Sequence, residues 1–167
     1  MQISKGKTDE VNVIFKLLQA CAKDMREKGI MQWNEHYPLI ENVVKDIENE
    51  ALYTVHIDGG IAGVIVFDDQ QSPEYQEVSW TLNEGKVGVV HRLAVDPTYQ
   101  GKGIARKLMD FIENMASQSG YKTIRLDAYS LNPRTLRFYQ NRGYTKCGQI
   151  FFPYREDPFY CFERRLE

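Results

Sequence analysis

The sequence has few cysteines, no long apolar run and no excess of basic residues. Its three cysteines, Cys21, Cys147 and Cys161, lack the CxxC spacing of a zinc or redox motif and are too few for a disulfide framework. No uncharged apolar stretch approaches the roughly 20 residues that span a bilayer. With a net charge of −2, the chain has no cationic field for nucleic acid or an anionic membrane. We therefore expect no metal site, no nucleic-acid partner and no membrane partner.

The first residues also lack a targeting signal. The segment MQISKGKTDE contains no apolar core of the kind found in a signal peptide, and we expect a cytoplasmic location. The chain does have 43% hydrophobic and 26% charged residues, which is the balance of a globular protein. Its length suits one domain, so residues 1–167 are predicted to form a single domain without a linker.

The N-terminal part of the chain is predicted to be helical. Apolar residues recur with helical spacing over residues 11–25, where Thr8 is the expected N-cap and Gly29 the expected end. A second helical pattern covers residues 40–47. The connector IMQWNEHYP holds three ring-bearing side chains before a proline, and we consider it a candidate wall of a substrate pocket.

The middle of the chain is predicted to form a sheet. The runs ALYTVHI and IAGVIVF, joined by the turn DGG, are typical of a hairpin. The segment EYQEVSWTL alternates, which suits a half-exposed strand or an extended loop. VGVVHRLAV is an almost unbroken apolar run, as expected of a central strand buried on both faces.

The C-terminal part continues with a crossover and closing strands. An amphipathic helix from Ile104 ends at Gly120, and the strand KTIRLDAY follows, which predicts a parallel strand–helix–strand unit. Asn132 is a suitable N-cap for a further helix. YTKCGQI and FYCFERRL are expected to close the sheet, and the second is a candidate edge that could pair with a second subunit in a homodimer.

The glycine-rich turn QGKGIA, residues 100–105, is the first motif that carries chemistry. A Walker A loop needs a glycine five residues before the Gly of its GK pair and a Ser or Thr after the lysine, where this sequence has Asp96 and Gly103. A dinucleotide GxGxxG motif counted from Gly101 meets Arg106 at its third small position. The spacing therefore excludes a P-loop and disfavours a Rossmann site.

A pyrophosphate still fits the turn. Its glycines leave backbone N–H groups uncovered at a helix start, where unpaired donors and the helix dipole favour an anion. Lys102, Arg106 and Lys107 add positive charge. The alternative is a tight turn with ordinary solvated basic residues.

Two motifs in this order resemble the GCN5-related N-acetyltransferases. In that family a buried strand precedes (Arg/Gln)-x-x-Gly-x-(Gly/Ala), which Gln100, Gly103 and Ala105 match. The family's Asn before a helix, with a Tyr seven residues later ahead of a Gly and an aromatic, is matched by NPRTLRFYQNRGY. The resemblance implies an α/β (α+β) single-domain fold with a mixed central sheet of six to seven strands flanked by about four helices.

The resemblance also implies an activity and a cosubstrate. The activity is acetyl-coenzyme A dependent N-acetylation of a primary amine on a small molecule or a peptide. The turn would bind the pyrophosphate of coenzyme A, and backbone groups near Leu93 and Val95 would meet the pantetheine and the thioester. The cofactor-binding residues implied are Leu93, Ala94, Val95, Gln100, Gly101, Lys102, Gly103, Ile104, Ala105, Arg106, Asn132, Arg134 and Tyr139.

Catalysis needs an acid for the leaving thiolate and a base for the amine. Tyr139 matches the family's tyrosine and is the candidate acid, whereas simple packing in a helix is the alternative. His91 alternates onto the face of Leu93 and Val95, and some family members place a catalytic His at this point of the strand. Glu77 is the rival base. For both, an ordinary structural role is the alternative.

No cysteine nucleophile is indicated, so we expect direct transfer in a ternary complex. The other class of function that we consider is a non-catalytic sensor module that binds acyl-CoA and regulates a partner. Candidate acceptor-binding side chains are the aromatic ones that could form pocket walls or stack on a cation, although each could equally be ordinary packing. They are Trp33, His36, Tyr37, Tyr75 and Trp80.

Overall fold

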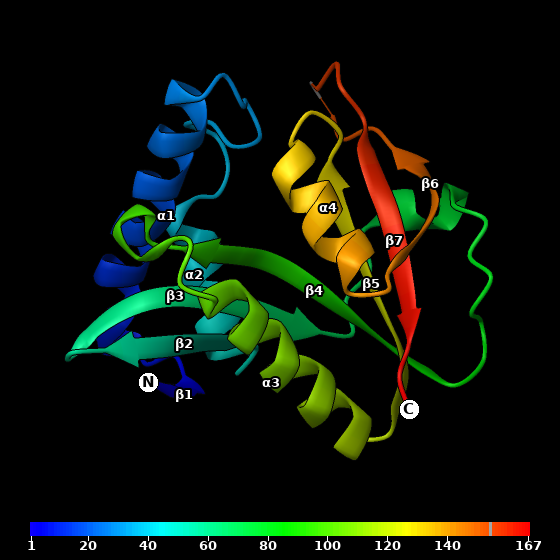
Figure 1. Cartoon of the computed structure of the whole chain (residues 1–167), viewed down its shortest axis with the longest axis horizontal. Helices are drawn as coiled ribbons and strands as arrows, with labels where there is room; N and C mark the ends of the chain where they lie inside the picture. Colours follow the sequence, from blue (N-terminus) through cyan, green and yellow to red (C-terminus); the bar gives the residue numbers. More distant parts are fainter. Residues whose placement is uncertain (154) are drawn as a thin grey trace. The chain divides into compact units, whose positions relative to one another are not determined.

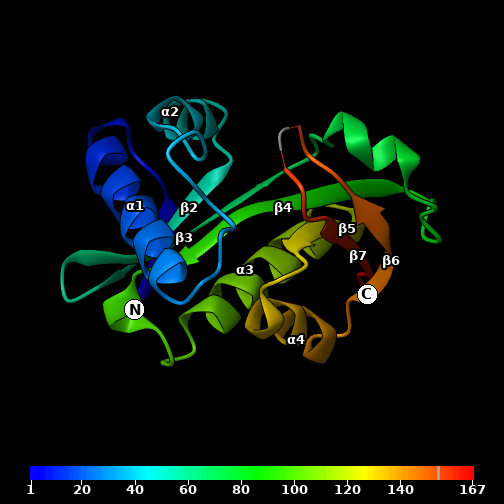
Figure 2. The same cartoon turned by 90° about the horizontal axis from the view of Figure 1, so that it is seen from above.

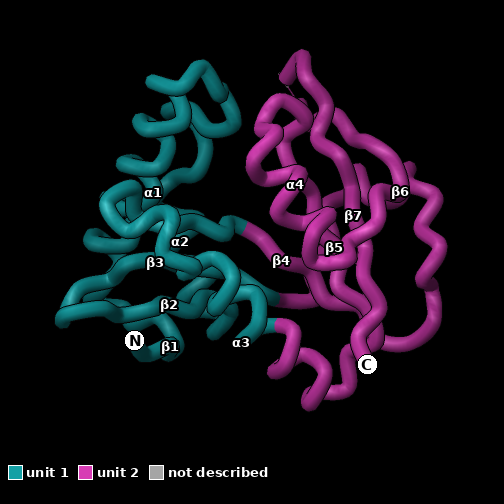
Figure 3. The backbone as a smooth tube through the Cα atoms, viewed as in Figure 1, with its two compact units in different colours: residues 1–67, 92–112 teal, residues 68–91, 113–167 magenta. Residues whose placement is uncertain are grey.

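The computed structural model describes residues 1–153 and 155–167. Its backbone divides into two compact units (Figure 3). Unit 1 comprises residues 1–67 and 92–112, and unit 2 comprises residues 68–91 and 113–167.

Unit 1 is an antiparallel sheet covered by two helices (Figure 1). Its strands are β1 (Gln2–Lys5), β2 (Leu52–Ile57) and β3 (Gly60–Asp68), and its helices are α1 (Val11–Glu27) and α2 (Ile40–Glu48). The apolar residues spaced three and four apart on each helix are buried in one core with the sheet, which is what the helical period predicts. That core includes Ile14, Leu18, Trp33, Val43, Leu52, Val64 and Val66.

Unit 2 is built on three antiparallel strands, β5 (Tyr121–Tyr129), β7 (Phe159–Arg165) and β6 (Thr145–Ile150). The helix α4 (Pro133–Asn141) and the segment 71–83 lie on opposite faces of this sheet (Figure 2). Alternation along β7 agrees with this arrangement. The ring of Phe162 lies 6.4 Å from that of Tyr139 on α4, whereas the next residue, Glu163, accepts hydrogen bonds from backbone N–H groups of segment 71–83.

The strand β4 (Lys86–Val95) and the helix α3 (Ile104–Gln118) each run through both units. In unit 2, β4 pairs in parallel with β5, and Val89 is opposite Arg125. The strand order is β1-β2-β3-β4-β5-β7-β6, with β4 in the middle. The predicted mixed sheet, its central strand and the parallel crossover are therefore confirmed, and so are the predicted hairpin and four α-helices.

Two local predictions are wrong because other hydrogen bonds compete with those expected. Thr8 does not cap α1: residues Thr8–Glu10 form a 3-10 turn, η1, and the Lys7 N–H donates to Glu10 Oε1 at 2.8 Å. The EYQEVSWTL segment forms no strand: it starts in a 3-10 helix, η2 (Pro73–Glu77), and only its remaining residues agree with the alternative of an extended loop. The first residue of η2 is a proline, which has no N–H to give to a sheet and suits a helix start.

The prediction that β7 is an edge strand is also wrong. β7 is bonded to β5 on one side and to β6 on the other, so β6 and not β7 borders the sheet in unit 2. The pattern of apolar residues predicts that a strand forms, but it does not predict which strands lie beside it. The short strand β1 was not predicted. No helix in the described ranges is long and apolar enough to cross a membrane.

Candidate active site

The glycine turn lies in unit 1, after β4 and a short 3-10 turn, η3 (Pro97–Tyr99). Gly101 and Gly103 have φ values of +79° and +78°, a region that glycine adopts without strain. A Cβ atom on either would meet nothing within 4 Å. The glycines are therefore required by the backbone conformation, and the space above them is open.

The donor set of the turn fits a pyrophosphate. The first N–H groups of a helix have no partner within the helix, and α3 begins at Ile104 directly after the turn. The side chains of Lys102, Arg106 and Lys107 are exposed. The side chain of Gln100 points back to the end of β4, because its Nε2 donates to the carbonyl of Val95 at 3.2 Å.

The middle of β4 has an unusual backbone. Arg92 has a φ of +38°, a left-handed conformation that costs about 1–3 kcal/mol in a residue other than glycine. Its half-buried side chain donates from Nε and Nη2 to Asp46 at 2.9 and 2.7 Å, and from Nη1 to the Tyr37 hydroxyl at 2.7 Å. These charge-assisted bonds offset the strain. The strict alternation expected from His91 to Val95 is interrupted at this residue.

His91 is half-buried in unit 2 and is held by an acid that the sequence did not indicate. Its Nε2 lies 2.9 Å from Asp68 Oδ1 at the end of β3. A carboxylate can only accept a hydrogen bond, so a neutral imidazole in this contact would carry its proton on Nε2 and leave the lone pair of Nδ1 free. The geometry is that of a histidine oriented for proton transfer, and it would also serve as a structural pair.

Tyr139 is buried on α4, with its ring packed against those of Phe138, Tyr144 and Phe162. Burial raises the pKa of its hydroxyl well above the ordinary value, with Asp127 as the next contribution. The phenol is therefore protonated at neutral pH. Asn132 is buried and caps α4 by accepting from the Thr135 N–H at 3.3 Å, as expected, and Arg134 is exposed.

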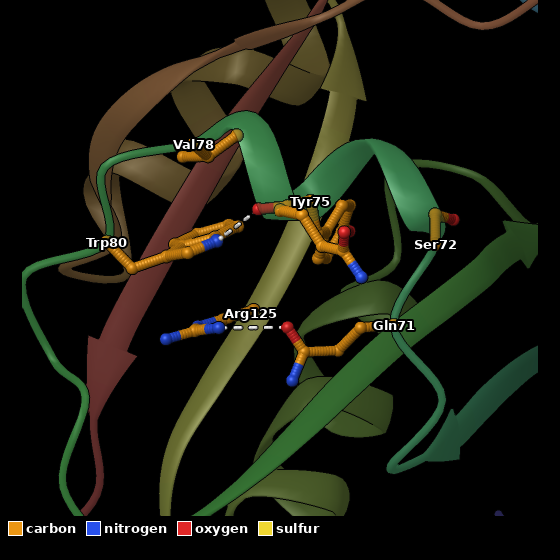
Figure 4. Close-up of a pocket in the computed structure, with 7 residues that line it drawn as sticks. Gln71, Ser72, Tyr75, Val78, Trp80 and Arg125 are labelled. Atoms are coloured by element: carbon orange, nitrogen blue, oxygen red, sulfur yellow. Dashed lines mark hydrogen bonds between the residues drawn. The ribbon is translucent and has the colours of Figure 1, made fainter.

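A pocket of about 320 Å³ in unit 2 brings together two of the aromatic acceptor candidates (Figure 4). Tyr75 is buried and donates from its hydroxyl to Asp127 at 2.6 Å, and its pKa is raised by burial first and by Asp127 second. Trp80 donates from Nε1 to the carbonyl of Tyr75 at 2.9 Å. The guanidinium of Arg125 lies 4.3 Å from the centre of the Trp80 ring. The other lining residues are Gln71, Ser72, Gln76 and Val78.

The remaining candidates lie elsewhere. Glu77 ends η2 and is exposed, and it does not line this pocket. In unit 1, Trp33 is 7% exposed within the core, which agrees with the packing alternative. His36 is exposed, and Tyr37 is bound to Arg92. Unit 2 thus contains the acid candidate, both base candidates and the two pocket aromatics, and unit 1 contains the glycine turn.

A family model decides the class of the protein. The model described as "Acetyltransferase (GNAT) family" matches residues 18–144. The chain belongs to the GNAT acetyltransferase family. A human relative of this GNAT protein, N-acetyltransferase 8B, is 35% identical over 72 residues, which are 43% of this chain and 31% of that protein. The chain therefore matches less than a third of that relative's length.

Solved structures share the GNAT fold. A GNAT acetyltransferase of Streptococcus agalactiae has a TM-score of 0.85 at 20% identity, and the alignment covers 99% of this chain and 95% of that one. A protein of Salmonella typhimurium, solved with "its cofactor Acetyl-CoA", has a TM-score of 0.73 at 18% identity over 100% of this chain and 94% of the other. At these identities the likeness shows the fold alone.

Three residues of this GNAT chain were missed at the level of sequence: Asp68, Arg125 and Asp127. Arg125 and Asp127 are charged residues two apart in KTIRLDAY, a strand that is otherwise largely apolar, and this is a signal that could have found them. Asp68 gives no such signal, since it lies among acidic turn residues and meets His91 only through the pairing of β3 with β4.

Proposed function

We propose that this GNAT protein transfers an acetyl group directly from acetyl-coenzyme A to a primary amine on a small molecule or a peptide. The observation that carries the proposal is the glycine turn at the start of α3, whose two left-handed glycines and open N–H groups suit a pyrophosphate in a chain of this family. When bound, the cosubstrate supplies the acetyl thioester. The chain's own residues supply binding and proton transfer.

Unit 1 supplies the binding of the donor. The backbone N–H groups that begin α3 would donate to the pyrophosphate, and the exposed Lys102 and Arg106 would reach further phosphate oxygens. Backbone groups of Leu93 to Val95 would bind the pantetheine arm, as the family resemblance implies. These contacts use the main chain, so we expect side-chain substitutions along β4 to affect them little.

Unit 2 supplies the base. Asp68 fixes the His91 proton on Nε2, so Nδ1 would accept the proton of the incoming amine, directly or through a water. Asp68 is then a positioning residue and His91 the base. This contact favours His91 over Glu77, which is exposed and has no side-chain hydrogen bond to another residue in the described ranges 1–153 and 155–167.

Unit 2 also supplies the acid. Tyr139 is protonated, because burial raises its pKa, and its hydroxyl would donate a proton to the leaving thiolate. A covalent acetyl-cysteine is disfavoured, since burial raises the pKa of Cys21 and Cys161 to about 12 and keeps both as unreactive thiols. Desolvation and Glu163 raise the pKa of Cys147 to about 12 as well.

The proposal is tested by the release of free coenzyme A thiol from acetyl-CoA with a pooled library of primary amines. The parent protein is expected to release thiol only when amines are present, and His91→Ala to reduce kcat/KM by about 10²-fold, the usual contribution of a general base. Glu77→Ala is the comparison for the rival base. Saturable binding of acetyl-CoA without thiol release from any amine would instead identify a sensor module.

A further inference from the structure

The pocket of unit 2 is built around a buried cation. Arg125 is 6% exposed, and its guanidinium donates to three neutral acceptors. Nη1 donates to Gln71 Oε1 at 2.9 Å, and Nη2 to the Leu82 carbonyl at 3.1 Å and Asn83 Oδ1 at 3.2 Å. Nε has no hydrogen-bond partner among residues 1–153 and 155–167. The side chain thus holds a full charge without a directly bound carboxylate.

The neighbouring acid does not neutralise this charge by contact. Burial lowers the pKa of Arg125, and Glu163, its register partner on β7, offsets this only in part. The Glu163 carboxylate, however, accepts hydrogen bonds from Thr81 and from the Leu82 N–H. Since burying a guanidinium without an ion pair is unfavourable, an anion in the pocket would be stabilised there.

The side chain of Gln71 marks where the anion would bind. Figure 4 shows its amide oxygen directed at Arg125 from the pocket side. Gln71 is exposed, so its amide can be displaced at little cost. A ligand carboxylate in its place would add the attraction of an ion pair to the hydrogen bond, and its two oxygens would suit the fork of the guanidinium. The indole of Trp80 and the hydroxyl of Ser72 complete the walls.

The pocket lies on the same side of the sheet as the candidate base. Val89 and Arg125 are register partners of two parallel strands, so their side chains share one face, and His91 follows Val89 by one strand period. The β4–β5 pairing ends at Val89–Arg125, and a regular continuation of β4 by two residues would give a Cα separation of about 8 Å between His91 and Arg125. Long side chains such as Arg and His can bracket a small molecule across that distance.

We propose that the Arg125 pocket binds the carboxylate of the acceptor, so that the acetylated amine belongs to an amino acid or a similar small molecule whose amine and carboxylate are a few bonds apart. This inference rests on the proposed function, because it names the substrate class of that activity. Arg125 would then determine the specificity for the acceptor. Gln71 would be the uncharged side chain that takes the place of the carboxylate on Arg125 when no acceptor is bound.

The kinetic test pairs amino acids with their carboxamides in the thiol-release assay. The parent is expected to favour the free acids, and the ratio of kcat/KM values, acid over carboxamide, is expected to fall at least tenfold in Gln71→Glu. That substitution preserves the shape of an exposed side chain and places a competing carboxylate on Arg125. Arg125→Gln is expected to lower the same ratio, and Arg125→Lys to retain part of it. Comparing ratios between variants cancels the different amine pKa values of acids and carboxamides.

Gln149→Glu is the matched control, since it adds the same charge to an exposed position of β6 outside the pocket and should leave the ratio unchanged. An unchanged ratio in Gln71→Glu would overturn the inference while leaving the acetyltransferase proposal intact. Equal losses on acids and carboxamides in Arg125→Gln, together with an unchanged ratio in Gln71→Glu, would show that Arg125 only anchors segment 71–83.

A binding measurement tests the proposed carboxylate site even if no amine is acetylated. Trp33 and Trp80 are the two tryptophans, so Trp33→Phe leaves the pocket indole as the single fluorophore. Titration with an amino acid such as leucine is expected to change its emission with an affinity at least tenfold above that of leucinamide. Thiol release without such a difference would contradict the carboxylate site alone. Binding of leucine without thiol release would contradict the proposed function alone.

Discussion

Two tyrosines of unit 2 pack against each other but have different surroundings. The rings of Tyr139 and Tyr144 are 5.7 Å apart, and both side chains are buried. The Tyr144 hydroxyl has no hydrogen-bond partner among the described residues, so it does nothing that a phenylalanine would not do. This pair therefore provides a variant and its matched control.

Replacing Tyr139 by Phe is expected to lower kcat by about 10²-fold with an unchanged Kd for acetyl-CoA, because a general acid acts in the chemical step. Tyr144→Phe is expected to change kcat less than twofold and to keep or raise the free energy of unfolding, since an unpaired buried hydroxyl is lost. Thiol release under saturating substrates and calorimetric donor titration measure the two quantities. Equal kcat values for Tyr139→Phe and the parent would remove the phenol from the mechanism.

The pH dependence follows from the raised pKa of Tyr139. The protonated phenol is the active form of an acid, and an upward shift keeps it protonated above its ordinary pKa near 10. With a saturating amine, kcat of the parent should therefore not fall between pH 8 and pH 10. A descending limb in this range that disappears in Tyr139→Phe would show that the hydroxyl ionises earlier than its burial implies.

At the residue level, the sequence indicates which side chains can transfer a proton, but it does not indicate which residues those side chains contact. The sequence predicts His91 and Tyr139 as candidates because an imidazole and a phenol can transfer protons and because both residues match family positions. Asp68 was not found, since it lies 23 residues from His91 and only the pairing of strands brings the two together. The neutral hydrogen-bond acceptors of Arg125 likewise depend on where segment 71–83 folds back.

At the level of elements, the sequence pattern predicts every α-helix, α4 through its N-cap Asn132 and the others through periodicity, and all strands except β1. Strands and helices that bury one face carry a period in their sequence, whereas η2 and the rest of segment 71–83 are fixed by side-chain hydrogen bonds to β5 and β7. The left-handed residue in β4 was also hidden, because an arginine at such a position has no sequence signature. The bond to Asp46 on α2 that supports it is a tertiary contact.

The turn before α3 gives a prediction at this scale. Gly103→Ala forces a Cβ onto a residue at φ +78°, which costs about 1–2 kcal/mol and is relieved by a shift of the turn. The N–H groups that begin α3 would move with it, so the Kd for acetyl-CoA measured by calorimetry is expected to rise about fivefold or more. Gly120→Ala is the control, since this glycine has a φ of +86° and equal space for a Cβ but lies beyond the other end of α3. It should lower stability by a similar amount and leave the Kd unchanged. A Kd that rises equally in both variants would argue against an anion at the turn.

On the scale of the whole molecule, each unit contains a buried cysteine whose thiol keeps its proton. Cys21 in unit 1 and Cys161 in unit 2 have pKa values raised from 9.0 to about 12, mainly by burial. The unfolded chain ionises these thiols from about pH 9, whereas the folded protein does not. A neutral buried thiol therefore leaves stability independent of pH below 9 and lets it fall as the pH rises from 9 toward 12.

Cys21 and Cys161 together should lower the free energy of unfolding by about 2 kcal/mol between pH 9 and pH 10, because each contributes about 1 kcal/mol over that interval. Urea unfolding under reducing conditions at pH 8, 9 and 10 measures the change. The double variant Cys21→Ser with Cys161→Ser should lose less stability over the same interval, by about 2 kcal/mol, while being less stable than the parent at pH 8. Each single variant should recover about half of the difference, since the two thiols lie in different units and titrate independently. Identical slopes for the parent and the double variant would mean that the folded thiols ionise near pH 9, and hence that one of them could act as a nucleophile.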